Sequence, residues 1–304
     1  MKSIVPQVLL LFILIIVSAC THQKNQEPAM PEKVCLVLSV GAAKGLAHVG
    51  VIDALKEQGI PIDCIYGNSM GAVVGSLYAT APSADLKSRY KEFVRKYEEV
   101  SQKEAAQRGI LYGLGAAVLS GGTSVVLGSA IFGANSVAEF DNDRFKGVLD
   151  DFFAQAQIQS LPIAFVTSYH QRQGQGMNLV VKQDGNLAEA VSGSANNPFI
   201  FKSSKIFKSF NLDGPVDPAA DRLAAVPVED AVRVFHPSKV IIANVTSTPA
   251  VYTKTAGVEF TEIMIFLNPG LKALRGVEPE FENAYQAGFQ ATKEALKQNT
   301  INNF

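Results

Sequence analysis

The sequence predicts a three-layer α/β/α fold, in which helices cover both faces of a mostly parallel central sheet. Two observations lead to this prediction. Val34–Val40 is an almost unbroken apolar run, as expected of a strand that is covered on both faces. The order strand, small-residue loop and helix occurs over residues 34–58 and again over residues 62–79. Such a βαβα order favours parallel strands.

Composition describes a globular chain rather than a disordered one. Of the 304 residues, 47% are hydrophobic and 18% are charged, which is enough to bury a large core. A formal net charge of −1, with no run of lysines and arginines, argues against a nucleic-acid partner. No cluster of Cys, His or carboxylate residues has metal-ligand spacing, and there is no phosphate-binding lysine motif. We therefore expect neither a metal nor a cofactor.

The first 19 residues predict an export signal. A charged start is followed by the apolar run Val8–Val17, which is short for a transmembrane helix. Val17–Cys20 resembles the bacterial lipobox, in which the cysteine becomes the first mature residue and carries the lipid. An ordinary signal peptide or an uncleaved anchor is the alternative. Lipidated Cys20 would attach the protein to a membrane.

Residues 20–32 are polar, include two prolines, and predict a tether. Thr21 follows Cys20, and in enterobacterial lipoproteins a residue other than Asp at that position usually indicates the outer membrane. The expected location is therefore the bacterial cell envelope, with a lipid anchor in the outer membrane. Residues 33–304 then form the globular domain.

The first unit of the fold runs from the strand Val34–Val40 through the loop Gly41–Gly45 to a helix at Leu46–Gln58. Gly59 follows that helix, as a C-terminal cap would. The second unit repeats this order from Ile62 onward. Parallel strands bring both connecting loops to the carboxyl edge of the sheet, where ligands bind in open α/β folds.

Gly67-Asn68-Ser69-Met70-Gly71 predicts a sharp turn between a strand and a helix. Such a turn exposes the serine hydroxyl and needs small residues at the positions of Gly67 and Gly71. The helix that begins at Met70 would present its N-terminus, which favours a nearby negative charge. Ser69 is therefore the candidate nucleophile.

Residues 38–48, taken together with Gly67–Gly71, resemble the patatin-like phospholipase family. The family pattern runs through most of residues 33–298. The resemblance implies that amides around Gly41, Ala42 and Ala43 form an oxyanion hole, that Ser69 is the nucleophile, and that one aspartate completes a dyad without histidine. It further implies a phospholipase A or lysophospholipase that acts on phospholipid or other lipid esters through an acyl-enzyme.

Asp213-Gly214-Pro215 stands where the resemblance places the catalytic aspartate. The preceding segment Ala190–Pro198 resembles the Ser-rich, Pro-containing segment of the family, and residues 226–231 resemble its following helix. A poorly solvated carboxylate can have a raised pKa and accept a proton from a serine hydroxyl. Asp213 is therefore the candidate base.

Three residues depart from the family pattern. Val40 and Ala42 flank Gly41 where the family has three successive glycines, and Pro215 replaces a Gly or Ala in the aspartate motif. A non-glycine residue forced to a positive φ would be strained and could misplace the amide donors. The alternative hypothesis is a weak or inactive protein of the same fold that binds lipid or a partner protein.

Several further elements are predicted from periodicity. Ser83–Val100 is an amphipathic helix. Residues 109–138 contain no charge and form either a mobile apolar cap over the site or a buried helical hairpin. The remaining predictions are strands at Leu161–Ser168, Asn178–Val181, Lys239–Val245 and Glu262–Leu267, and a closing amphipathic helix at Glu278–Lys297.

Two histidines and two cysteines need an interpretation. His236 alone follows Asp213 in the order that a serine–histidine–acid triad of the other α/β class requires, whereas His48 is expected to be structural. Cys35 and Cys64 precede the ends of their strands by equal distances, so parallel pairing would place them at one level. A disulfide is conceivable, but we expect two buried free thiols.

Overall fold

The computed structural model of the chain describes residues 32–100, 140–173, 176–196, 201–202, 211–212, 225–246, 248–267 and 279–300. The elements below belong to one compact unit, Lys33–Phe304. Predictions that concern Cys20, the uncharged segment 109–138 and Asp213 lie outside the described residues.

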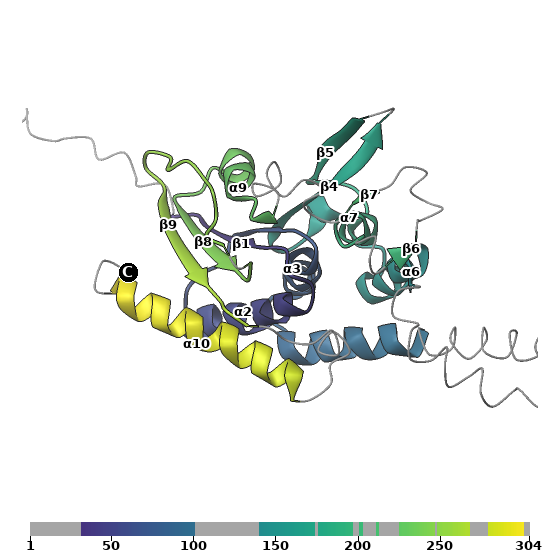
Figure 1. The fold of residues 1–304 in the computed structure, drawn as a ribbon, viewed down its shortest axis with the longest axis horizontal. Helices are drawn as coiled ribbons and strands as arrows, with labels where there is room; N and C mark the ends of the chain where they lie inside the picture. Colours follow the sequence, from purple (N-terminus) through teal and green to yellow (C-terminus); the bar gives the residue numbers. More distant parts are fainter. Residues whose placement is uncertain are drawn as a thin grey trace, which may run out of the picture. The chain divides into compact units, whose positions relative to one another are not determined.

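Within the described residues, seven strands form one sheet in the order β5-β4-β2-β1-β8-β9, and β7 pairs with β4 (Figure 1). The strands of this sheet are β1 (Val34–Leu38), β2 (Cys64–Gly67), β4 (Ala164–Gln173), β5 (Gly176–Lys182), β7 (Asn211–Leu212), β8 (Lys239–Asn244) and β9 (Glu259–Met264). Strands β1, β2, β4, β8 and β9 run parallel, whereas β5 and β7 run antiparallel to β4. The prediction of a mostly parallel sheet is confirmed.

The described helices are α2 (Ala47–Glu57), α3 (Met70–Thr80), α6 (Asn142–Phe153), α7 (Leu187–Ser194), α9 (Val228–Phe235) and α10 (Glu280–Thr300), with short 3₁₀ turns η1 (Ala42–Leu46) and η3 (Ile158–Ser160). Residues 86–100 are also helical, as predicted. Helix α6 was not predicted, although Phe145, Val148, Leu149 and Phe153 are spaced as on one helix face and are buried. No helix in the described part of the chain is long and apolar enough to span a membrane.

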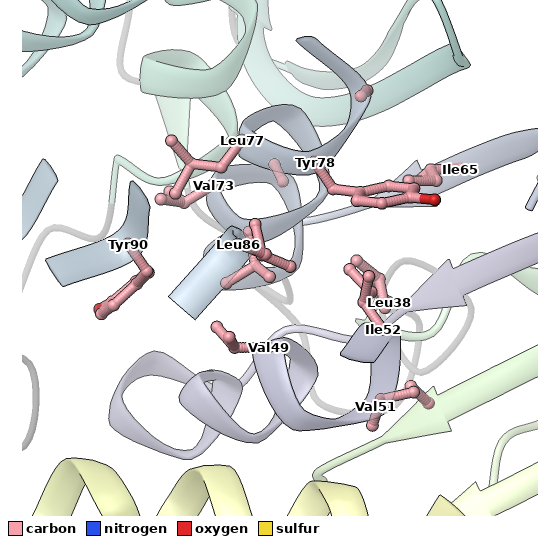
Figure 2. Close-up of a cluster of buried hydrophobic side chains, with 14 of the residues drawn as sticks. Leu38, Val49, Val51, Ile52, Ile65, Val73, Leu77, Tyr78, Leu86 and Tyr90 are labelled. Atoms are coloured by element: carbon pink, nitrogen blue, oxygen red, sulfur yellow. The ribbon is translucent and has the colours of Figure 1, made fainter. Parts of the chain in front are cut away.

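Alternate residues of the strands enter two separate cores. Leu36 and Leu38 of β1 pack with α2, α3, α7 and α10, and Figure 2 shows part of this cluster around Leu38, Ile65 and Leu77. Cys35 and Val37 point to the opposite face, where they pack with α9. Because helices cover both faces, the three-layer prediction is confirmed.

The prediction for the two cysteines was wrong. Both side chains are fully buried, as expected, but a disulfide joins Cys35 to Cys64. The two residues are direct neighbours in the register of β1 and β2, with a Cα–Cα distance of 4.6 Å, which lies within the range that a disulfide spans. The spacing along the chain predicted the common level of the two residues but not the distance between them.

Strand β9 begins and ends earlier than predicted. Its ladder with β8 runs from Glu259, opposite Lys239, to Met264, opposite Asn244. The pairing ends with β8, since the chain of β8 leaves the sheet after Asn244. The apolar residues that follow β9 had extended the predicted strand to Leu267.

Candidate active site

Ser69 occupies the turn between β2 and α3, at the carboxyl edge of the sheet. Its backbone has φ 54° and ψ −122°, a conformation that a residue with a side chain rarely adopts. A serine before a helix commonly caps it, but the Ser69 side chain makes no capping hydrogen bond to α3. The hydroxyl, on a residue only 4% exposed, is therefore not used to complete the helix.

The two glycines of this turn are required by close backbone contacts. A β-carbon added at Gly67 would lie 2.3 Å from the carbonyl oxygen of Gly71. One added at Gly71 would lie 2.5 Å from the carbonyl oxygen of Leu38 and 2.8 Å from that of Ser39. The turn therefore packs backbone to backbone against the end of β1, directly before the glycine-containing loop.

The loop after β1 presents free amide donors at the same edge. Among the described residues, the backbone N–H groups of Gly41, Ala42, Ala43 and Met70 have no hydrogen-bond acceptor. By contrast, the neighbouring Val40 N–H donates to the carbonyl oxygen of Ala225 at 2.9 Å. Strands β1 and β2 are adjacent and parallel, so these donors and Ser69 gather at one edge. Such a group of donors can stabilise an oxyanion.

Of Val40 and Ala42, the two residues at which backbone strain was expected in the loop after β1, only one has a positive φ. Ala42 has φ 44°, in the left-handed region, whereas Gly41, with φ 176°, lies outside that region. Val40 is not among the described residues that have a positive φ. Ala42 keeps its amide but holds it on a strained backbone.

Replacing Ala42 by glycine is expected to stabilise the protein by about 1 kcal/mol, because glycine adopts a positive φ without strain. Urea denaturation of both proteins measures the difference. The matched control is Ala43→Gly, one residue further on and without a positive φ, which is expected to destabilise by about 0.5–1 kcal/mol. A destabilised Ala42→Gly variant would contradict the strain.

His48 is structural, as predicted. It is fully buried on α2, and its Nε2 donates to the carbonyl oxygen of Ser39 at 2.9 Å. Burial lowers the pKa of His48 to about 4, and the hydrogen bond with Ser39 opposes that shift only in part. The imidazole is therefore neutral at physiological pH and holds the end of β1.

The pKa of His48 predicts a loss of stability in acid. Between pH 6.5 and 4 the unfolded chain binds a proton at this residue that the folded chain does not, so stability falls as the pH falls. From pH 7 to pH 5 the loss from His48 is about 2 kcal/mol. Urea denaturation of wild type and His48→Gln at both pH values tests this. The stability difference between the two proteins should shrink by that amount, and a difference independent of pH would contradict the prediction.

His236 does not lie at this edge. It caps the C-terminal end of α9 and precedes Lys239, where β8 begins, so it lies at the amino edge of the sheet. Ser69 follows the carboxyl end of β2, which is parallel to β8 through β1. A strand of six residues spans about 20 Å, which separates the two side chains. The alternative triad was therefore wrong.

Three polar residues that sequence analysis did not single out surround the turn. Asn68 Oδ1 accepts from the N–H of Ser168 at 2.9 Å, and the N–H of Ser69 donates to Ser194 Oγ at 3.0 Å. Asn68, Ser168 and Ser194 are all buried. No local signal could have identified these contacts, because they join residues about 100 or more positions apart. In the described residues, no group of three or more His, Cys, Asp or Glu side chains could hold a metal ion.

The fold and this edge define an α/β protein that presents a serine on a strained turn between a strand and a helix, beside free amide donors. A model of the patatin-like phospholipase family matches residues 36–229, well over half of the chain. The chain therefore belongs to the patatin-like phospholipase family.

Curated relatives match over short segments. Lysophospholipase nte1 of Emericella nidulans is 44% identical over 84 residues, which are 26% of this chain and 6% of that protein. Human patatin-like phospholipase domain-containing protein 6 is 41% identical over 68 residues, which are 22% of this chain and 5% of that protein. The chain thus spans only a small part of the length of these relatives.

Solved structures match over most of this chain. VipD from Legionella pneumophila has a TM-score of 0.41 at 12% identity, over 89% of this chain and 67% of that one. The ExoU–SpcU complex of Pseudomonas aeruginosa gives 0.39 at 15% identity, over 88% of this chain and 52% of the matched chain. The fold class itself rests on the sheet and helices described above.

Proposed function

We propose that the protein is a membrane-tethered serine acyl hydrolase of the phospholipase A or lysophospholipase type. The observation that carries this proposal is the backbone of Ser69, at φ 54° and ψ −122°, with a hydroxyl that does not cap α3. Strain of this kind costs of order 1–3 kcal/mol and collects at functional sites. Membership in the patatin-like phospholipase family supports a lipid ester as the substrate.

In the proposed reaction, Asp213 accepts the proton of the Ser69 hydroxyl, and the Ser69 oxygen attacks the ester carbonyl. Amides of residues 41–43, with Met70, stabilise the oxyanion that forms. Asp213 gives this proton to the leaving oxygen, so that the alcohol departs, and the carboxylate then takes a proton from the water that releases the fatty acid and restores the Ser69 hydroxyl.

Strand β7 supports the choice of Asp213. It ends at Leu212, the residue before Asp213, and Leu212 pairs with His170 of β4. Two residues before His170, Ser168 hydrogen-bonds to Asn68, the neighbour of Ser69. Asp213 therefore follows a strand whose partner contacts the turn that carries the serine.

The membrane attachment is proposed from residues 1–32, with Cys20 as the lipidated residue and the outer membrane as the location. Sensitivity of processing to globomycin and recovery in the outer-membrane fraction are the expected results. A soluble mature form without lipid would contradict the proposal.

A binding protein without turnover is the second candidate, favoured by the strained Ala42 in the amide loop and by Pro215 after Asp213-Gly214. A fluorophosphonate probe separates the two candidates, because it modifies only an activated serine. Labelling of the mature, lipid-free protein, together with fatty-acid release from a phospholipid and lysophospholipid panel, supports the enzyme. A folded protein that neither labels nor releases fatty acid supports the binding protein.

A further inference from the structure

Ser194, the last residue of α7, makes two hydrogen bonds that link separate parts of the fold. Its Oγ accepts from the backbone N–H of Ser69 at 3.0 Å and donates to the backbone carbonyl of Ser168, in β4, at 2.9 Å. Its side chain is fully buried. The Ser194 hydroxyl therefore uses both its proton and one of its lone pairs in hydrogen bonds of ordinary length.

Strand β4 holds the same turn from a second side. The N–H of Ser168 donates to Asn68 Oδ1 at 2.9 Å, and Asn68 Nδ2 donates to Ser168 Oγ at 2.9 Å. Asn68, Ser168, Ser194 and Ser69 thus form a chain of buried hydrogen bonds around the strained residue. Both residues before α3 are fixed by groups outside their own strand and helix.

Helix α7 must lie close to β4 for Ser194 to reach the turn. Gly193 allows this, because a β-carbon there would lie 2.9 Å from the ring of Tyr169 in β4. The Ser194 hydroxyl is therefore brought to Ser69 by the close packing of a helix and a strand that lie more than 90 residues further along the chain.

The hydrogen bond to Ser194 also distinguishes two neighbouring backbone amides, those of Ser69 and Met70. The N–H of Ser69 is used by Ser194, whereas the N–H of Met70 has no acceptor among the described residues. Without the Ser194 hydroxyl, a buried N–H would lose its partner on a residue that is already strained. We expect the backbone of the turn to relax in that case and to turn the Ser69 hydroxyl away from the substrate.

We propose that Ser194 is a positioning residue, whose hydroxyl holds the backbone of Ser69 in the conformation that aims its side chain at the substrate. This inference rests on the proposed role of Ser69 as the nucleophile. A displacement of a reacting group by about 1 Å can cost about 100-fold in rate.

The test compares Ser194→Ala with Ser76→Ala. Ser76 is an equally buried serine in α3, but its hydroxyl bonds only the carbonyl of Val73 in its own helix. We expect Ser194→Ala to label with a fluorophosphonate about 10- to 100-fold more slowly than wild type, yet to the same final extent. Ser76→Ala should label within about twofold of the wild-type rate.

The folded fraction separates positioning from stability. A variant that unfolds reversibly labels more slowly only in proportion to its folded fraction, so a rate lowered 10-fold or more in a protein that urea denaturation shows to be mostly folded is not an effect of stability. With a soluble ester, Ser194→Ala should lower kcat and leave KM nearly unchanged. Ser194→Cys keeps a weak donor of similar size and should fall between wild type and alanine; it decides the matter if the alanine variant does not fold.

Two outcomes would overturn the inference in distinguishable ways. A labelled wild type with an unchanged rate in Ser194→Ala, or in a folded Ser194→Cys when alanine fails, overturns the role of Ser194 alone. A folded wild type that does not label at all overturns the proposed nucleophile and this inference with it.

Discussion

Replacing Ser69 by alanine is expected to abolish fluorophosphonate labelling and to lower lipid ester hydrolysis by about 10⁴-fold or more, to the background rate. The reason is that the acyl-enzyme can form only through the Ser69 oxygen in the proposed reaction. The hydroxyl does not cap α3, so its removal should change the free energy of unfolding by no more than about 0.5 kcal/mol. Mass spectrometry of the labelled protein, a fatty-acid release assay and urea denaturation give these three quantities.

The control for this experiment is Ser76→Ala, which removes the same atom from the same helix region while leaving the turn unchanged. It should retain labelling and hydrolysis. If Ser69→Ala kept a substantial part of the wild-type activity while remaining folded, another nucleophile would carry the reaction, and the strained turn would need a different explanation.

Local patterns predicted the part of the fold that surrounds this serine. The apolar run of β1 and the helical spacing of α2 are properties of neighbouring residues. The two glycines around Ser69 are needed because the turn contacts the backbone at the ends of adjacent elements. The position of the turn at the carboxyl edge then followed from the parallel order of β1 and β2.

The sequence could not show what depends on distances between remote residues. Whether Cys35 and Cys64 bond depends on the 4.6 Å between their Cα atoms, which no spacing along the chain determines. The hydrogen bond between Ser69 and Ser194 joins a buried backbone N–H and a buried side-chain hydroxyl that are 125 positions apart. Which residue of the amide loop carries the positive φ, Ala42 rather than Val40, is likewise a result of packing and not of pattern.

Asparagine in place of Asp213 is expected to lower kcat about 10²- to 10⁴-fold, which is the contribution typical of a general base. Asparagine has nearly the same shape as aspartate, but its amide cannot take the proton of the Ser69 hydroxyl. Because substrate binding does not require that proton transfer, KM should change little. Steady-state hydrolysis of a soluble ester measures both constants.

A second Asp-Gly pair in the same chain provides the matched control. Asp184 is exposed and precedes Gly185, which has φ 87° in the turn between β5 and α7, so Asp184→Asn changes the charge of a turn that carries no chemistry. It should keep the wild-type kcat. Comparison of Asp213→Asn with Asp213→Ala then separates proton acceptance from hydrogen bonding: equal losses in both variants assign the effect to the missing base. Wild-type kcat in a folded Asp213→Asn would remove the carboxylate from the mechanism and leave the Ser69 hydroxyl in need of another proton acceptor.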